Sequence, residues 1–199
     1  MMKVQRNEIL DLGSYEQVRE RFRAAVIAEK QHRRFVISDE LSIVFENHTT
    51  VLFQIQEMLR TERITREAAI QHEIETYNDL VPGARELSAT LFVEIADRDT
   101  RERRLVELAG LEGTFALEVD GEIEPARNET RGVLPDRTTA VHYLKFPLSQ
   151  KMFDKLAAPG ARAATGVKLL VRHPRLELAR SLPDDVVRAL ADDLVDASA

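Results

Sequence analysis

The sequence of 199 residues contains no cysteine, so it cannot form disulfide bonds, a thiolate metal site or a cysteine nucleophile. It also has no apolar run close to the ~20 residues that a membrane-spanning helix needs. Residues 1–11 are mixed and polar, and they lack the apolar segment of a secretory signal peptide. The last two absences predict a soluble, cytoplasmic protein that does not enter a membrane.

An excess of positive charge is also lacking. The chain has 28 Lys and Arg against 34 Asp and Glu, and its formal net charge is -6. Both signs are interspersed along the chain. Because general nucleic-acid binders rely on a basic surface, this composition argues against a nucleic-acid partner.

Several motifs with well-understood chemistry are missing. The sequence has no phosphate-binding P-loop, no GxGxxG fingerprint and no GxSxG nucleophile elbow. It has no His-Glu-x-x-His motif and no pair of Glu-x-x-His motifs of the di-iron type. We therefore expect no metal ion and no cofactor, and no motif identifies catalytic residues.

Apolar residues recur with regular spacing along nearly the whole chain. Ser14 and Gln17 have the spacing of a capping box, and Val18 and Phe22 follow at a helical interval. Residues 87–95 instead alternate between two faces, as in a strand. These patterns predict helices over about 15–31, 49–63, 65–81, 99–109 and 149–159 and a C-terminal helix opening at Pro183, with strands over about 35–37, 41–45, 87–95, 115–119, 138–146 and 167–171.

The order of these elements predicts a single α+β domain over residues 1–199. We expect a mixed, mostly antiparallel sheet packed with several helices. The helices over 49–63 and 65–81 should form a helical hairpin that stops at Pro82-Gly83. Asp120-Gly121 is a hairpin turn signal, and residues 127–137 are expected to form a loop.

The helix expected over 49–63 has two different faces. At roughly 100° per residue, Val51 and Ile55 point to one side, whereas Phe53, Glu57 and Arg60 point to the other. A phenylalanine among charges suggests that this outer face meets another part of the chain, a second subunit or a ligand. The simpler alternative is a solvated ion pair beside a partly buried ring.

Polar residues gather where the strand over 41–45 meets this helix. Glu46, Asn47 and His48 stand at the junction, and functional groups are commonly held at the ends of elements. Gln54 and Gln56 flank the apolar stripe. Their amides can bond either to neighbouring backbone or to a ligand, and the sequence leaves both readings open.

His142 shares a strand face with Leu144 and Phe146, so it is expected to be a core histidine. If its strand lies beside the strand with Thr90 and Glu94, a contact between histidine and glutamate can form. Such a contact would be a candidate acid–base or metal pair.

Several stretches together resemble a known family. FENHTTVLFQIQEMLRTERI, EIETYNDLVPG, ELSATLFVEI and VHYLKF are similar to the bacterial family catalogued as domain of unknown function 3501, and the similarity runs from SYEQVRERFR to RALADDL. The resemblance implies a stand-alone cytoplasmic bacterial protein. Members are often encoded beside a rubrerythrin-like protein and an iron–sulfur oxidoreductase, which implies a role near peroxide defence or redox metabolism. The signature that the resemblance transfers comprises Glu46, Asn47, Thr49, Gln54, Gln56, Glu57, Arg60, Tyr77 and Asn78.

Two functional hypotheses follow. The first is an accessory binding or interaction protein linked to redox or peroxide-stress metabolism, whose helical hairpin docks on a redox partner or on a second copy. The alternative is a small metal-dependent or acid–base enzyme, with a polar pocket where Glu46, His48 and Glu57 meet, together with Tyr77. The candidates for ligand or partner binding are Glu46, Asn47, His48, Gln54, Gln56, Glu57, Arg60, Tyr77 and Asn78.

Overall fold

The computed structural model describes residues 1–128, 134–157 and 166–196. Its helices are α1 (Leu12–Gln31), α2 (His48–Thr61), α3 (Glu67–Asn78), α4 (Arg98–Glu107), α5 (Gln150–Ala157) and α6 (Asp184–Asp196), with short 3-10 turns η1 (Arg6–Glu8) and η2 (Leu111–Gly113). Its strands are β1 (Arg34–Val36), β2 (Leu41–Glu46), β3 (Glu86–Val93), β4 (Phe115–Val119), β5 (Glu122–Pro125), β6 (Arg127–Asn128), β7 (Val141–Pro147), β8 (Val167–His173) and β9 (Leu176–Ser181). The predicted α+β class is confirmed.

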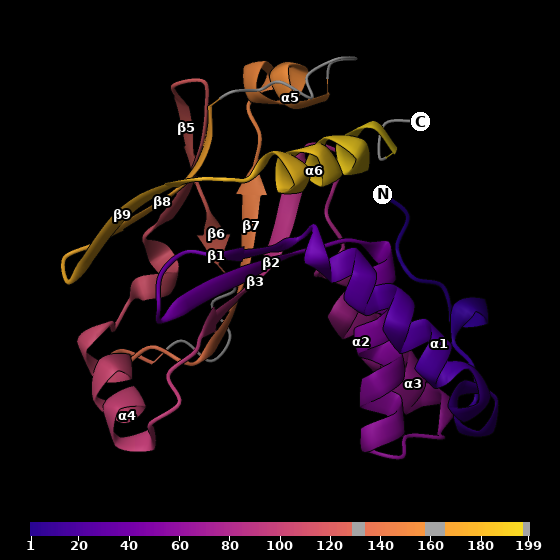
Figure 1. Cartoon of the computed structure of the whole chain (residues 1–199). Helices are drawn as coiled ribbons and strands as arrows, with labels where there is room; N and C mark the ends of the chain where they lie inside the picture. Colours follow the sequence, from indigo (N-terminus) through magenta and orange to yellow (C-terminus); the bar gives the residue numbers. More distant parts are fainter. Residues whose placement is uncertain (129–133, 158–165, 197–199) are drawn as a thin grey trace.

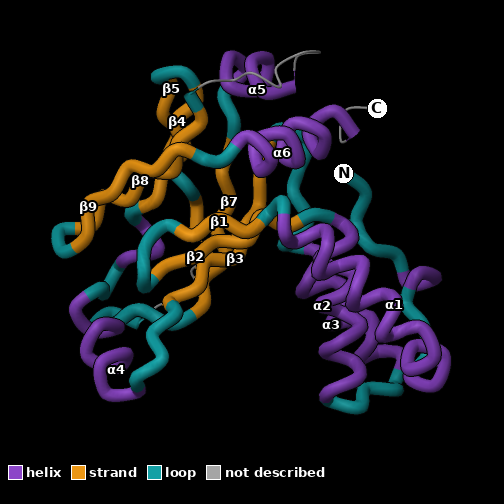
Figure 2. The backbone as a smooth tube through the Cα atoms, viewed as in Figure 1, coloured by secondary structure: helices purple, strands orange, loops and turns teal. Residues whose placement is uncertain are grey.

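The strands form two sheets. The larger sheet has the order β1-β2-β3-β7-β6, and the smaller has the order β5-β4-β8-β9. Every pair among these strands is antiparallel. Helices α1, α2 and α3 form a bundle on one side of the molecule, and α5 and α6 lie at the end where the chain terminates (Figures 1 and 2).

The main core lies between the two sheets. It takes the apolar side chains of β2, β3 and β7 from the larger sheet and those of β4 and β8 from the smaller one. Phe45 and Phe146 lie with their ring centroids 6.1 Å apart, and Leu190 of α6 and Met152 of α5 cover the core. Each fully buried side chain of this kind contributes roughly 1.5–3 kcal/mol, so this layer holds the sheets together.

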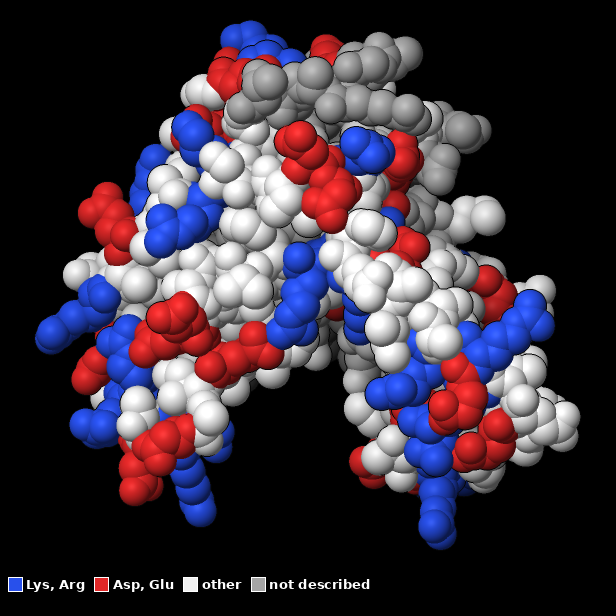
Figure 3. Space-filling view, viewed as in Figure 1, with Lys and Arg blue, Asp and Glu red and all other residues white. Residues whose placement is uncertain are grey.

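The helical bundle has a separate, smaller core. Val51 and Ile55 of α2 pack against Ile70 and Ile74 of α3, which confirms the predicted apolar stripes and the helical hairpin. Helix α1 packs on α2 from the other side. Figure 3 shows a hollow between this bundle and the limb that carries α4, with basic and acidic side chains mixed over the visible surface.

The beginning of α1 differs from the prediction, whereas α2 begins within one residue of it. Helix α1 starts at Leu12, because Asp11 rather than Ser14 is its N-cap and accepts the Ser14 backbone N–H at 3.0 Å. Helix α2 is capped by Asn47, whose side chain accepts the Thr50 backbone N–H at 3.0 Å. Asp, Asn, Ser and Thr are all good N-caps, so residue type alone could not choose among neighbours.

Three strands were missed, although the turn signal at Asp120-Gly121 implied a hairpin partner at the place of β5. β9 is an edge strand whose side chains are mostly exposed, so it lacks the apolar signal of a buried strand. β6 takes the first two residues of the loop predicted over 127–137, and residues 129–133 of that loop lie outside the described residues. The Asp120-Gly121 turn is confirmed, with φ of 46° and 85° joining β4 to β5. In the part of the chain that the structure describes, no helix combines the length and the apolar character needed to cross a membrane.

Candidate binding site

The larger sheet has one apolar face and one polar face. Residues that pair directly across antiparallel strands point to the same side. The register therefore places Glu46 of β2, Ser88 of β3, Lys145 of β7 and Arg127 of β6 in one row on the polar face. The opposite face carries the leucines and phenylalanines of the main core.

Glu46 begins this row as a buried carboxylate. It is only 3% exposed, and it accepts hydrogen bonds from Thr50 (2.5 Å), Gln54 (2.9 Å) and Thr90 (2.5 Å). A buried carboxylate without such donors would be costly. Two predicted candidates, Glu46 and Gln54, are thus brought together, and they join α2 to the sheet.

Ser88 lies between Glu46 and Lys145 in the same row. Its residue is 2% exposed, and its hydroxyl has no hydrogen-bond partner within the described residues. A buried hydroxyl without a partner costs roughly 1–3 kcal/mol. The polar face therefore carries hydrogen-bonding capacity that the fold itself does not use.

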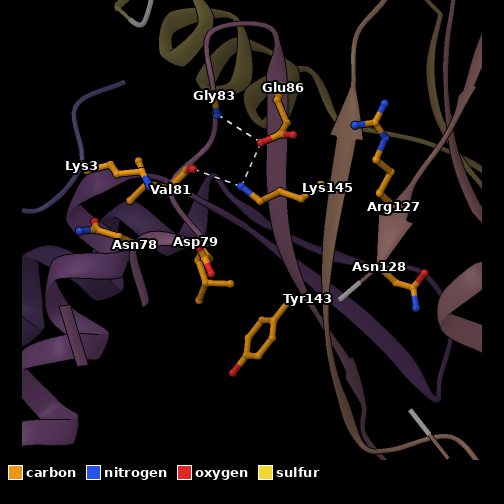
Figure 4. A pocket seen from close by; sticks show the side chains of 11 residues that line it. Lys3, Asn78, Asp79, Val81, Gly83, Glu86, Arg127, Asn128, Tyr143 and Lys145 are labelled. Carbon is orange, nitrogen blue, oxygen red and sulfur yellow. Dashed lines mark hydrogen bonds and ion pairs between the residues drawn. The ribbon is translucent and has the colours of Figure 1, made fainter. Parts of the chain in front are cut away.

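A pocket of about 440 Å³ opens at the other end of the row (Figure 4). Its wall comes from the N-terminal segment, the end of α3 and the loop that follows, and strands β3, β6 and β7. Lys3, Arg127 and Lys145 supply positive charge to the wall, and Asp79 and Glu86 supply negative charge.

Asn78 fixes the N-terminal segment in the wall. Its side-chain oxygen accepts the Val4 N–H at 2.8 Å, and its amide donates to the Val4 carbonyl at 2.9 Å. Asn78 and Val4 are both buried, so this pair of hydrogen bonds is shielded from water. It places the neighbouring Lys3 at the pocket.

Lys145 and Glu86 form the central ion pair of the pocket. The Lys145 Nζ donates to Glu86 at 2.9 Å and to the Val81 carbonyl at 3.1 Å. Glu86 also accepts the Gly83 N–H at 3.3 Å, so it ties the loop after α3 to the sheet. Figure 4 shows these three bonds.

Two tyrosines lie beside the pocket. Tyr143 lines it, and both Tyr143 and the predicted candidate Tyr77 pack partly buried against the core of the helical bundle. Burial, followed by the nearby Tyr143 and Glu73, raises the pKa of Tyr77. The Tyr77 phenol is therefore neutral at physiological pH.

The outer face of α2 contacts another part of the chain, which is the first of the three contacts that the sequence left open. Glu57 accepts bonds from the Tyr15 hydroxyl and from the Arg19 guanidinium, each at 2.8 Å. These bonds, the Arg19 bond first, lower the pKa of Glu57. Phe53 meets an aromatic ring of α1 edge-on with centroids 5.6 Å apart. Arg60 donates to α1 at 2.6 Å, so the expected pair between Glu57 and Arg60 is replaced by two links to α1.

The predicted pocket of Glu46, His48 and Glu57 does not form. His48 pairs with Glu8 at 3.0 Å, whereas Glu46 faces the sheet and Glu57 faces α1. The physical reason is helical rotation: nine residues separate His48 from Glu57, which at roughly 100° each places them on opposite sides of the helix.

Asn47 and Gln56 serve the backbone and neighbouring side chains. Asn47 caps α2 and donates to Glu29 at 2.8 Å. Gln56 is 1% exposed, and it accepts the Leu10 N–H at 2.7 Å and donates to the Leu10 carbonyl at 3.3 Å. Of the two roles left open for Gln56, the structure shows bonding to backbone.

His142 is a core histidine, and the conditional contact with Glu94 does not form. β7 does pair with β3, yet His142 lies opposite Leu91 on the apolar face, away from Glu94. Its Nε2 lies 2.6 Å from the Thr138 hydroxyl and 3.9 Å from Glu112, and burial lowers its pKa. Thr138 and His142 are only four residues apart, whereas Glu112 belongs to η2 and reaches them through the tertiary fold.

The sequence also gave no sign of the pocket. Lys3, Arg127 and Lys145 are far apart in the chain and match no motif, and only the β6–β7 register reveals that two of them are neighbours. In the residues that the structure describes, no three His, Asp or Glu side chains are grouped so as to hold a metal ion.

The chain is similar to a protein of known structure and to one family. A crystal structure of a novel protein of unknown function from Burkholderia pseudomallei K96243 superposes with a TM-score of 0.87 at 35% sequence identity, over 96% of this chain and 99% of that one. No protein with a curated description matches. The family described as Protein of unknown function (DUF3501) matches residues 3–194. The chain therefore belongs to the DUF3501 family.

Proposed function

We propose that the protein is an accessory binding protein that acts through the pocket between α3 and the polar face of the larger sheet. The observation that carries this proposal is the pocket itself. Its volume of about 440 Å³ lies in the range of small-molecule sites. Segments that are far apart in the sequence build it, and hydrogen bonds that involve the Asn78 amide and the Glu86 carboxylate hold those segments in place. Such a wall is organised before any ligand arrives.

A link to redox or peroxide-stress metabolism is the finer part of the proposal, and it is supported by the family resemblance alone. The partner that the resemblance suggests is a rubrerythrin-like protein or an iron–sulfur oxidoreductase. Affinity capture with the tagged protein tests this link, and size-exclusion chromatography tests association with a second copy. Capture of neither kind of redox protein, together with a monomeric elution volume, would remove the link.

Gly83 provides a way to block the pocket. A Cβ at this position would meet only Glu86, at 3.7 and 3.8 Å, so a side chain fits without backbone strain. Gly83→Phe should therefore fill the pocket and leave the fold intact. Gly113→Phe is the matched control, because a Cβ there meets nothing within 4 Å and Gly113 does not line the pocket.

The experiment measures thermal unfolding with a library of small acids, amines, sugars and nucleosides. A ligand at a hundred times its Kd stabilises a protein by about 2.7 kcal/mol, which corresponds to roughly 5–10 °C for a chain of this size. We expect at least one class of compound to raise the Tm of the wild type and of the Gly113→Phe control. The same compounds should leave the Tm of Gly83→Phe unchanged. If no compound raises the Tm, or if Gly83→Phe responds as the wild type does, the proposal is wrong.

A further inference from the structure

We infer that the pocket binds the oxyanion group of a small acid, a carboxylate or a phosphate, among Lys3, Arg127 and Lys145, and that Glu86 limits the affinity. This inference rests on the proposed binding function, because it names the chemical class of ligand for the same pocket. It goes beyond that proposal by naming the residues that select the ligand.

A like-charged pair lies in the pocket wall, and only one of its two cations has an ion-pair partner among the described residues. Arg127 and Lys145 are directly opposite each other in the register of β6 and β7. Like charges at such positions destabilise a sheet, because their side chains start only about 5 Å apart. Lys145 is paired with Glu86, but Arg127 has no ion-pair partner among the residues that the structure describes. An anion between the two cations would remove the repulsion.

The described part of the pocket wall carries more positive than negative side chains. Three cationic and two acidic side chains line the described part of the pocket, although the whole chain carries a net charge of -6. In the view of Figure 4, Lys145 lies between Lys3 on one side and Arg127 on the other. An oxyanion has several acceptor sites, so it can bond to more than one of these cations at once.

The C-terminal end of α3 lies at the pocket, and its helix dipole would otherwise repel an anion. The carbonyls of its last turn are already bonded: Tyr77 accepts the Leu80 N–H at 2.9 Å, and Asn78 accepts the Val81 N–H at 3.2 Å. Beyond Asp79 and Leu80, the Val81 carbonyl accepts from Lys145. Because these groups are satisfied within the chain, they leave the pocket to the charged side chains.

Lys145 retains a donor for the ligand. An ammonium group has three N–H donors, and the bonds to Glu86 and the Val81 carbonyl use two of them. The third can reach a ligand while the existing pair persists. Glu86 then stands beside the bound anion as a like charge, and this repulsion is why we assign it the role of limiting the affinity.

The test measures binding of inorganic phosphate and of succinate by isothermal titration calorimetry, with ¹H–¹⁵N spectra to locate the site. We expect at least one probe to bind the wild type and to shift the amide signals of the pocket wall. Arg127→Gln should weaken binding about tenfold, as expected for one charged hydrogen bond at a partly exposed site. The matched control is Arg172→Gln, because Arg172 is an exposed strand arginine of the smaller sheet. The Arg172→Gln variant should bind the probe with the affinity of the wild type.

Glu86→Gln should tighten binding, because it removes the competing charge and keeps the size of the side chain. Binding of phosphate alone identifies a phosphate ligand, and binding of succinate alone identifies a carboxylate. Equal affinity of Arg127→Gln and the wild type would overturn the inference. If neither probe binds but an amine, sugar or neutral compound binds in a way that Gly83→Phe blocks, the inference fails and the proposed function stands. If no class binds, both fail.

Discussion

Arg33 links three parts of the chain through a buried ion pair. Its guanidinium donates to Asp193 of α6 at 2.5 and 2.9 Å and to Glu29 of α1 at 2.6 Å. Arg33 is 4% exposed and Asp193 is 8% exposed, so both charges are almost fully removed from water. The pair therefore connects the helical bundle to the C-terminal helix.

We predict that Arg33→Met destabilises the protein by about 3–4 kcal/mol at pH 8. Methionine keeps most of the apolar volume, so the loss comes from Asp193, which is left buried without a cation, and breaking such a pair typically costs roughly 3–5 kcal/mol. Burial already raises the pKa of Asp193 against the pull of Arg33. Without Arg33 this pKa must rise further.

The pH dependence has a definite sign. A carboxyl group with a raised pKa in the folded state binds its proton more tightly there than in the unfolded chain, so stability is gained as pH falls through the folded pKa. The deficit of Arg33→Met should therefore be largest at pH 8 and smaller at pH 5. Urea unfolding at both pH values measures it.

A double variant separates the ion pair from simple packing. Arg33→Met with Asp193→Leu removes both charges, and we expect it to recover most of the lost stability, because apolar replacements of buried ion pairs are often neutral. A loss below about 1 kcal/mol in Arg33→Met, or a double variant as unstable as the single one, would refute the assignment of a buried, mutually dependent pair.

Three further predictions concern the other polar contacts. Glu57→Gln should lose less stability in acid than the wild type does. Hydrogen bonds from α1 lower the pKa of Glu57 below its ordinary 4.5, and the stability that they provide disappears as pH falls through that lowered value. Urea unfolding between pH 7 and 3 measures this, and an unchanged pH dependence in the variant would contradict it. Ser88→Ala should be neutral or slightly stabilising, because its hydroxyl has no partner within the described residues. Thr90→Val should cost about 1–2 kcal/mol of stability, because Glu46 loses a hydrogen-bond donor. Equal losses of stability in the two variants would contradict this difference. His142→Leu should remove part of the stability that is lost between pH 7.5 and 5.5. Burial lowers the pKa of His142 below 6.5, so the unfolded chain binds the proton more readily and stability decreases as the pH decreases. Thermal unfolding at the two pH values should show a smaller difference in the variant than in the wild type.

Local patterns of residues were enough to predict most of the elements. The apolar stripe of α2 is buried as its 3.6-residue period required, and Ile70 and Ile74 of α3 meet it. The Asp120-Gly121 turn has the positive φ values that its residue types favour. These features depend on neighbours within a few positions, and the chain itself supplies those neighbours.

The candidate residues could be predicted only in part. Glu46 and Gln54 meet on the sheet, and Asn78 lines the pocket. For Glu57 and Arg60 the sequence left open a solvated ion pair or a contact of the outer face, and only the position of α1 shows that they bond to that helix. The helical period gives the direction in which a side chain leaves the helix axis. It does not identify the element that the side chain meets there.

The sequence by itself determined the helices, most strands, the two-sided character of α2 and the α+β class, because each follows from periodicity and turn chemistry over short distances. The tertiary structure decided which strands are neighbours, and so it alone brought Arg127 beside Lys145 and Ser88 beside Glu46. It also placed Glu112 of η2 beside His142. These pairs are separated by between 18 and 42 residues along the chain. Their proximity depends on strand register in the larger sheet and on the packing of η2, which no local pattern encodes.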